Sequence, residues 1–98
     1  MTSDRELLEK AARAAGVTHP DILRAHMASG WNPLTDDGDA LRLAVKLGLD
    51  IQFQKPSGVE ARNAAATSYY VSNLDSDPYA ATRRAIVRAA AAIWKETP

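Results

Sequence analysis

The sequence predicts an α+β fold in which three to four helices pack on a small antiparallel β-sheet, a hairpin. Apolar residues recur at helical spacing in the N-terminal, central and C-terminal parts of the chain. They alternate with polar residues over 49–54, and β-favouring residues fill 67–71. Helices covering one face of a short antiparallel sheet define the α+β class. We therefore expect one domain over residues 1–98, with helices in about half of the chain.

The first helix is expected to begin at Ser3. Ser3 and Glu6 have the spacing of a capping box, in which two side chains satisfy free amides at a helix start. Apolar residues then recur at helical spacing until Gly16, which can adopt the left-handed conformation that ends a helix. A second, shorter helix is expected with Pro20 in its first turn. The conformation of residues 17–30 is nevertheless left open between a helix and an extended segment.

The central helix has the clearest boundaries of the chain. Asn32 precedes a proline and is therefore restricted to an extended conformation. Thr35 or Asp36 then caps a helix whose first turn is acidic, which suits the positive end of the helix dipole. Gly48 provides the stop. We predict a helix that ends near Leu47, followed at once by a strand.

The sheet is expected to contain residues 49–55 and 67–72, paired as a hairpin. Leu49, Ile51 and Phe53 alternate with polar residues, which indicates a strand with one buried face. Residues 59–66 are ambiguous and are read as an extension of the hairpin with an irregular loop. After a polar break, Asp77 and Pro78 start the last helix, which should run to about Lys95.

Large apolar residues are scarce, because much of the apolar content is alanine. Close, alanine-mediated helix packing or a partner surface is therefore expected, and self-association fits this composition. The residues expected to supply most of the buried area are Leu7, Leu8, Ile22, Leu23, Leu34, Leu41, Leu43, Val45, Leu47, Ile51, Phe53, Val71, Ile86, Val87 and Ile93.

Composition argues against several kinds of partner. Twelve basic and twelve acidic residues cancel, so the chain has no overall field to attract nucleic acid or anionic membranes. The chain has no cysteine, which suits a reducing cytoplasm and removes disulfides and thiolate metal sites. No apolar run is long enough for a membrane span, and the polar start does not resemble a signal peptide. We expect a cytoplasmic protein that binds neither membranes nor, as its main activity, nucleic acid.

The candidate catalytic and metal-binding residues have simpler structural explanations. Asp36, Asp37 and Asp39 could hold a divalent cation, but the further ligands of a calcium loop are missing, so a charged helix start is preferred. His19 and His26 match no hydrolase or zinc pattern. We therefore expect no metal, no cofactor and no enzymatic activity.

Four residues are predicted to contact a partner. Arg84 and Arg88 lie on the cationic last helix, where they could also hold phosphate. Tyr70 lies in the second predicted strand, and Trp94 ends an alanine-rich helix whose small side chains allow close approach. Protein binding is the leading interpretation. Nucleotide or nucleic-acid binding, with the arginines on phosphate and the tyrosines stacking on bases, and structural self-association are the alternatives.

Two segments resemble small, mostly uncharacterised proteins of tailed bacteriophages and prophages. They are WNPLTDDGDALRLAVKLG at 31–48 and DPYAATRRAIVRAAA at 77–91. The resemblance implies no catalytic residues. It implies an accessory protein that acts inside the host cell by binding a host or defence component, with inhibition of a CRISPR-type immune complex, or of a nucleotide-signalling defence, as the most specific version.

Overall fold

The structure, a computed structural model, describes residues 3–54, 57–64, 67–72 and 77–94. Within these residues the chain forms four helices and three strands in an α+β arrangement, as predicted, and the helices cover about half of the chain length. The elements are, in order, α1 (Asp4–Ala14), α2 (Pro20–Ala28), α3 (Asp37–Leu47), β1 (Asp50–Gln54), β2 (Gly58–Arg62), β3 (Ser68–Ser72) and α4 (Pro78–Ile93). None of the described helices is long and apolar enough to span a membrane.

The sheet has the order β1-β2-β3 with antiparallel neighbours, so the predicted direct pairing of the first and last strands is wrong. Strand β2 occupies the place between them, mostly within residues 59–66, which were read as an extension of the hairpin with an irregular loop. Val59 and Ala61 face α4 and are fully buried, with Phe53 and Ile51 beside them on β1 and Val71 and Tyr69 beside them on β3. Burial against α4 therefore stabilises a strand that its own short, alanine-containing pattern did not reveal.

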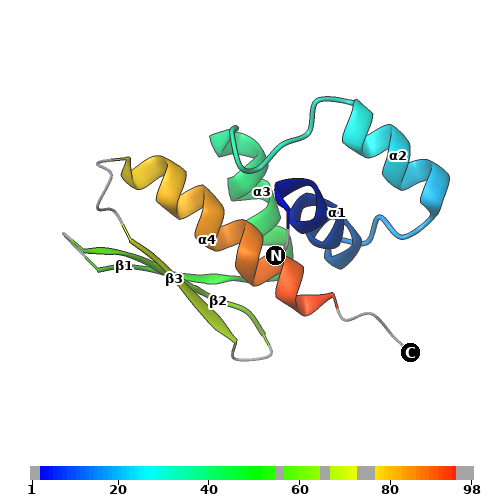
Figure 1. Cartoon of the computed structure of the whole chain (residues 1–98). Helices are drawn as coiled ribbons and strands as arrows, with labels where there is room; N and C mark the ends of the chain where they lie inside the picture. Colours follow the sequence, from blue (N-terminus) through cyan, green and yellow to red (C-terminus); the bar gives the residue numbers. More distant parts are fainter. Residues whose placement is uncertain (1–2, 55–56, 65–66, 73–76, 95–98) are drawn as a thin grey trace.

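Helix α4 lies between the sheet and the other helices, and α2 is farthest from the sheet (Figure 1). One side of α4 places Ala81, Ala85 and Ala89 against the inner face of the sheet. The opposite side places Ile86, Val87 and Ala90 in a second cluster with residues of α1 and α3. Alanine on the sheet side allows the helix to approach closely, as the composition predicted, and α4 is buried on both its sheet side and its helix side.

The predicted starts of α1 and α3 and the predicted end of α3 are confirmed. The Oγ atom of Ser3 accepts a hydrogen bond from the Glu6 amide at 3.2 Å. Asp36 caps α3, with its Oδ2 atom 2.8 Å from the Asp39 amide nitrogen. Gly48 ends that helix in the left-handed conformation, with a φ of 62°, and the strand begins at Asp50. Residues 17–30, left open by the sequence, contain the helix α2.

Four residues predicted to lie in the core are exposed instead: Ile22, Leu41, Val45 and Phe53. Ile22 lies on α2, which packs mainly against α1 and buries only Leu23. Leu41 and Val45 lie on a flank of α3 that no described element covers, and Phe53 lies on β1, beyond the part of the sheet that α4 reaches. The sequence correctly marked these residues as apolar, but no described helix or strand covers them. The end of the first predicted strand at Lys55 and of the last predicted helix at Lys95 lie outside the described residues.

Asn63 joins the sheet to α4. It is 4% exposed, its Nδ2 atom donates to the Ala89 carbonyl at 2.9 Å, and its Oδ1 atom accepts from the Thr67 amide at 3.1 Å. Because a buried polar group is costly without partners, these contacts hold the connection between β2 and β3 against the helix.

Candidate functional site

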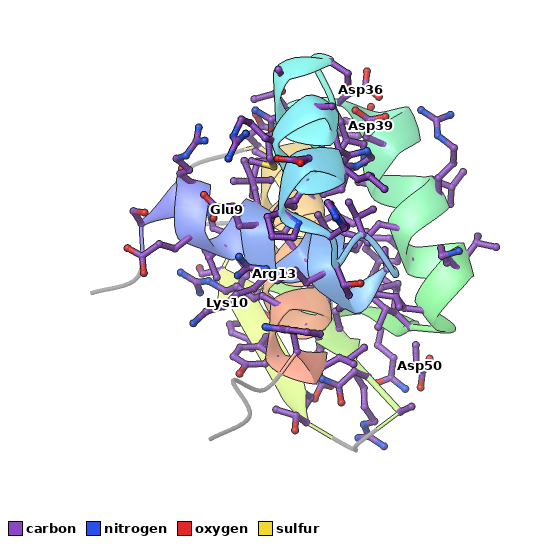
Figure 2. All side chains as sticks on the ribbon, turned by 90° about the vertical axis from the view of Figure 1, so that its right-hand side faces the viewer. Glu9, Lys10, Arg13, Asp36, Asp39 and Asp50 are labelled. Carbon is purple, nitrogen blue, oxygen red and sulfur yellow. The ribbon has the colours of Figure 1, made fainter. Side chains whose placement is uncertain are left out.

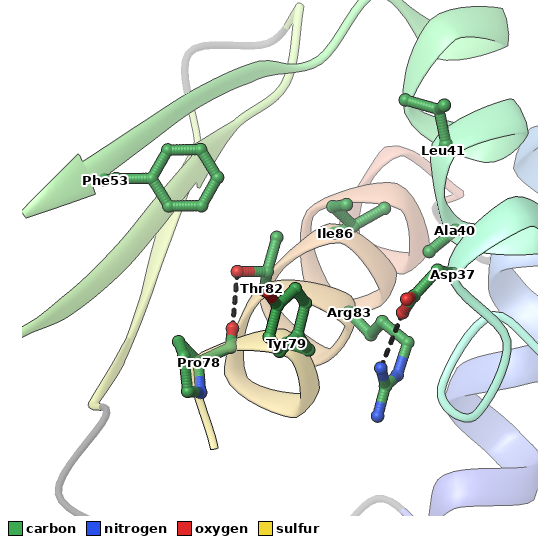
Figure 3. A pocket seen from close by; sticks show the side chains of 9 residues that line it. All are labelled: Asp37, Ala40, Leu41, Phe53, Pro78, Tyr79, Thr82, Arg83 and Ile86. Carbon is green, nitrogen blue, oxygen red and sulfur yellow. Dashed lines mark hydrogen bonds and ion pairs between the residues drawn. The ribbon is translucent and has the colours of Figure 1, made fainter. Parts of the chain in front are cut away.

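A cleft of about 420 Å³ opens between α3, α4 and β1. Figure 3 shows Phe53 on the β1 side, Leu41 on the α3 side, and Tyr79, Thr82 and Ile86 on α4 between them. Asp37 and Arg83 lie together at the junction of α3 and α4. The lining residues are Asp37, Ala40, Leu41, Phe53, Pro78, Tyr79, Thr82, Arg83 and Ile86. Most of this surface is apolar, as is typical of clefts that bind a ligand or partner.

Three exposed large apolar residues line this cleft, and a fourth lies next to it on α3. Leu41 is 64% exposed, Phe53 60% and Tyr79 69%, and Val45, one turn beyond Leu41 on α3, is 72% exposed. We call these four residues the open corner. Helix α4 packs on β2 and β3. The inner face of β1 is therefore not covered by α4 at Phe53. The open corner thus lies at the edge of the fold, where the sheet ends at β1 and the helix layer ends at the exposed flank of α3.

The polar groups of the cleft wall are satisfied within the protein. The Nη1 atom of Arg83 lies 2.6 Å from Oδ1 of Asp37, and its Nε atom donates to the Leu34 carbonyl at 2.8 Å. The hydroxyl of Thr82 donates to the Pro78 carbonyl at 2.7 Å. Arg83 therefore fastens the start of α3 to α4 with its charge compensated, and the cleft offers apolar contact rather than an open cationic site.

The predicted contact residues Arg84 and Arg88 lie one turn apart on α4, next to α1. Arg84 forms a bidentate pair with Asp4, with Nη1 3.1 Å from Oδ1 and Nη2 3.2 Å from Oδ2. This hydrogen bonding, aided by the positive charges of Arg84 and Arg88, lowers the pKa of Asp4. In the described fold, Arg84 thus joins α4 to the first turn of α1. A contact of either arginine with a partner stays a prediction.

The predicted contact residues Tyr70 and Trp94 lie elsewhere. Tyr70 is between two residues that face α4, so it points to the opposite, uncovered face of the sheet. There it packs over Gly58, where an added Cβ atom would lie 2.8 Å from the Tyr70 Cζ atom. Trp94 is the half-buried C-cap of α4. The structure therefore brings the two arginines together, but it does not join all four predicted residues into one surface.

The acidic residues at the start of α3 act as caps and ion-pair partners. Asp39 accepts from the Asn32 amide at 2.9 Å and from Arg42 at 2.8 Å, and the backbone hydrogen bond from Asn32 is the largest cause that lowers the pKa of Asp39. Figure 2 shows Asp36 and Asp39 near one end of α3 and Asp50 beyond the other. Among residues 3–54, 57–64, 67–72 and 77–94, no three His, Cys, Asp or Glu side chains are grouped to hold a metal ion.

The histidines make local structural contacts. The Nδ1 atom of His19 accepts from the Asp21 amide at 3.2 Å and so caps α2. The His26 ring lies beside the Trp31 ring, with centroids 4.6 Å apart. These contacts agree with the structural roles that the sequence predicted for both residues.

Comparison with known proteins identifies no relative. No protein-family model matches the chain, and neither a curated protein nor a solved structure matches it. The likeness to phage proteins therefore stays a prediction.

The sequence interpretation missed the open corner, although a signal for it was present. Leu41, Leu43, Val45 and Leu47 spread over a wide arc of an eleven-residue helix. One neighbouring layer covers only a limited stripe of a helix. An apolar arc too wide to be covered by one neighbouring layer therefore indicates a second contact surface on the helix. Leu41 and Val45 lie in the part of the arc that stays exposed.

Proposed function

We propose that this chain is a binding protein without catalytic activity, and that the open corner is its contact surface. The observation that carries the proposal is the exposure of four large apolar residues at the open corner, three of which line the cleft. Surfaces of this kind mark interaction sites, because water-exposed apolar area gains free energy when a partner covers it. Aromatic residues such as Phe53 and Tyr79 are typical anchors of protein interfaces.

The charges of the protein support a protein target over a nucleic acid. Arg83 and Arg84 are engaged by Asp37 and Asp4, and the net charge of the chain is zero. Phosphate recognition depends on cations that release counterions when they bind. A cleft whose only lining arginine is compensated therefore favours apolar contact with a protein.

The target we propose is a host protein, most specifically a component of a CRISPR-type immune complex. Support comes from the resemblance of 31–48 and 77–91 to accessory proteins of phages, which act inside the host cell. In this proposal the chain inhibits the complex by occupying one of its surfaces, and no covalent chemistry is required.

A plating assay tests the target class. Phage is plated on bacteria with active CRISPR immunity that express either the wild-type chain, Phe53→Ser or Ile22→Ser. Ile22 is as exposed as Phe53, at 61%, but lies on α2 away from the cleft. We expect the wild type and Ile22→Ser to restore plaques and Phe53→Ser to fail. No restoration by the wild type contradicts the immune target, and equal restoration by Phe53→Ser contradicts the surface.

Capture from host lysate at micromolar concentration tests binding itself. The same three proteins serve as baits, with Tyr70→Ala and Trp94→Ala as two further baits for the residues that the sequence predicted. We expect one partner to be recovered by the wild type and by Ile22→Ser, and to be lost with Phe53→Ser. Loss with Tyr70→Ala or Trp94→Ala alone would move the contact surface to the residues predicted from the sequence.

A further inference from the structure

Strand β1 is an edge of the sheet, and its outer side has no strand neighbour in the described part of the chain. Its five residues, Asp50–Gln54, pair only with β2. An edge strand presents unpaired backbone amides and carbonyls, and proteins usually protect such an edge with charges, proline, a bulge or a covering element. Within β1 only Asp50 carries a charge. The edge is therefore open to pairing with another strand.

The sequence of β1 is complementary to itself in one antiparallel register. With a two-fold axis at Gln52, Ile51 of one copy lies opposite Phe53 of the other, on the face that carries the open corner. Gln52 lies opposite Gln52, and Asp50 lies opposite Gln54, so that an acid faces an amide. Apolar and aromatic pairs across strands are favourable, whereas like charges directly opposite are destabilising. This register contains two favourable pairs and no like-charge pair.

We propose that a second copy of this chain covers the open corner, through antiparallel pairing of β1 with β1 about an axis at Gln52. The two three-stranded sheets then form one continuous sheet. The uncovered flanks of the two α3 helices, with Leu41 and Val45, flank the new junction. The pairing supplies partners both for the unpaired edge and for apolar side chains that the single chain leaves in water.

The exposed area is large enough to contribute to a dimer. A fully buried aromatic residue removes about 150–250 Å² from water, so Phe53 and Tyr79 at their exposures contribute roughly 200–300 Å². With Leu41 and Val45, the open corner supplies on the order of 400–500 Å² per copy, against about 800 Å² per partner in a standard interface. The β1 backbone and the polar residues around it contribute the remainder.

Strand β3 is the other edge, and it differs. Its inward residues Tyr69 and Val71 already pack against α4 with β2, so pairing at this edge would bury little further apolar area. The difference between the edges points to β1 as the place of association. This inference shares its surface with the proposed function, so a second copy and a target compete for the open corner, and self-association regulates target binding.

A charge exchange at the axis tests the proposal without any target. Gln52 is exposed and lies opposite Glu60 of β2, so Gln52→Lys adds an opposite-charge pair and Gln52→Glu a like-charge pair within the single chain. Circular dichroism and thermal unfolding of each variant check that the single chain stays folded. Sedimentation equilibrium is measured for the wild type, for each variant alone and for an equal mixture. We expect a wild-type dimer, a dissociation constant raised about tenfold or more in each variant alone, and recovery of the dimer in the mixture.

Ser68→Glu on β3, the other edge, is the matched control, because it places a new charge opposite Arg62 of β2 and should leave the dimer unchanged. A monomeric wild type at about 100 μM overturns the proposal, as does a dimer that neither charge change weakens or that the mixture does not restore. The capture experiment, repeated with Gln52→Lys as the bait, separates this inference from the proposed function. Capture without a wild-type dimer removes only this inference, and a dimer without capture removes only the proposed function.

Discussion

The part of the sheet formed by β2 and β3 is packed more completely than the part formed by β1. We call the first part the closed side, and the second part, together with the exposed flank of α3, the open side. On the closed side, α4 covers β2 and β3, and the buried residues of that contact, three alanines of α4 with Val59 and Ala61 of β2, are at most 6% exposed. On the open side, β1 and the flank of α3 leave Leu41, Val45, Phe53 and Tyr79 mostly in water. The smaller side chains are buried and several of the larger ones are not. Burial in this protein therefore depends on whether an element covers a residue more than on how apolar that residue is.

The contrast also separates two uses of apolar residues. Alanine contributes little area, but it allows α4 to lie close to the sheet, so many main-chain and Cβ atoms are removed from water together. Larger residues at the open corner contribute little to the stability of the single chain, and their area remains available for binding. Mutations on the two sides should consequently affect different measurements.

Ala85→Leu should have the largest effect on stability. Ala85 is fully buried where α4 meets the sheet, so a larger side chain must displace the helix. We expect the free energy of unfolding, measured by urea denaturation, to fall by about 3 kcal/mol. The matched change Ala25→Leu, at an exposed position of α2, should stay within about 0.5 kcal/mol of the wild type. Equal effects of the two changes would show that the closed side is not tightly packed.

Asn63→Ala should have the second-largest effect on stability, because it removes the hydrogen bonds that link the β2–β3 connection to α4. The Thr67 amide loses a hydrogen-bond acceptor and the Ala89 carbonyl loses a donor. We expect a loss of about 2 kcal/mol in the same measurement. Gln54→Ala, which removes an exposed hydrogen bond to Glu60 at 3.2 Å on the open side, should cost less than about 0.5 kcal/mol. A small effect of Asn63→Ala would mean that the connection is held by packing alone.

Asp39→Asn should cost about 1 kcal/mol at neutral pH, because the Asn32 amide and Arg42 lose a charged acceptor. The pKa of Asp39 is lowered in the folded state from its ordinary value of 3.8. Its stabilising contribution is therefore fully present above pH 3.8 and is lost as the pH falls through the lower, folded-state pKa. Urea denaturation between neutral pH and pH 3 should accordingly show a shallower acid loss for Asp39→Asn than for the wild type. Identical profiles would exclude this contribution.

Phe53→Ser should have the smallest effect on the stability of the single chain. Phe53 is mostly in water, so at concentrations where the chain is monomeric we expect a change within about 0.5 kcal/mol. Light scattering at higher concentration should nevertheless show loss of the dimer, whereas Ile22→Ser should retain it. A large loss of monomer stability would place Phe53 in the core and remove the distinction between the two sides.

The sequence predicted the helix ends well, because these depend on local chemistry. Ser3, Asp36, Gly48 and Asp77 each perform the capping or stopping role that their position indicated. Residue patterns also identified β1 and β3 as strands. These features are decided by contacts within a few residues, and a single sequence contains that information.

Other features depend on contacts distant in the chain and could not be predicted in the same way. Strand β2 is stabilised by burial of Val59 and Ala61 under a helix that begins nearly twenty residues later. The ion pair of Arg84 with Asp4 joins residues eighty positions apart, and no local pattern in the sequence indicated it. Apolar periodicity indicates which face is apolar and not whether another element covers it. The wide apolar arc of α3 indicated a second contact surface, but the meeting of Leu41, Phe53 and Tyr79 at one cleft is seen only in the fold.

Amide hydrogen exchange, resolved along the two edge strands and measured at high and low protein concentration, tests most directly whether the open side is a contact surface. We expect the outward amides of β1 to be protected at high concentration and to exchange rapidly on dilution, while those of β3 exchange at a rate independent of concentration. Equal, concentration-independent exchange at both edges would contradict pairing through β1.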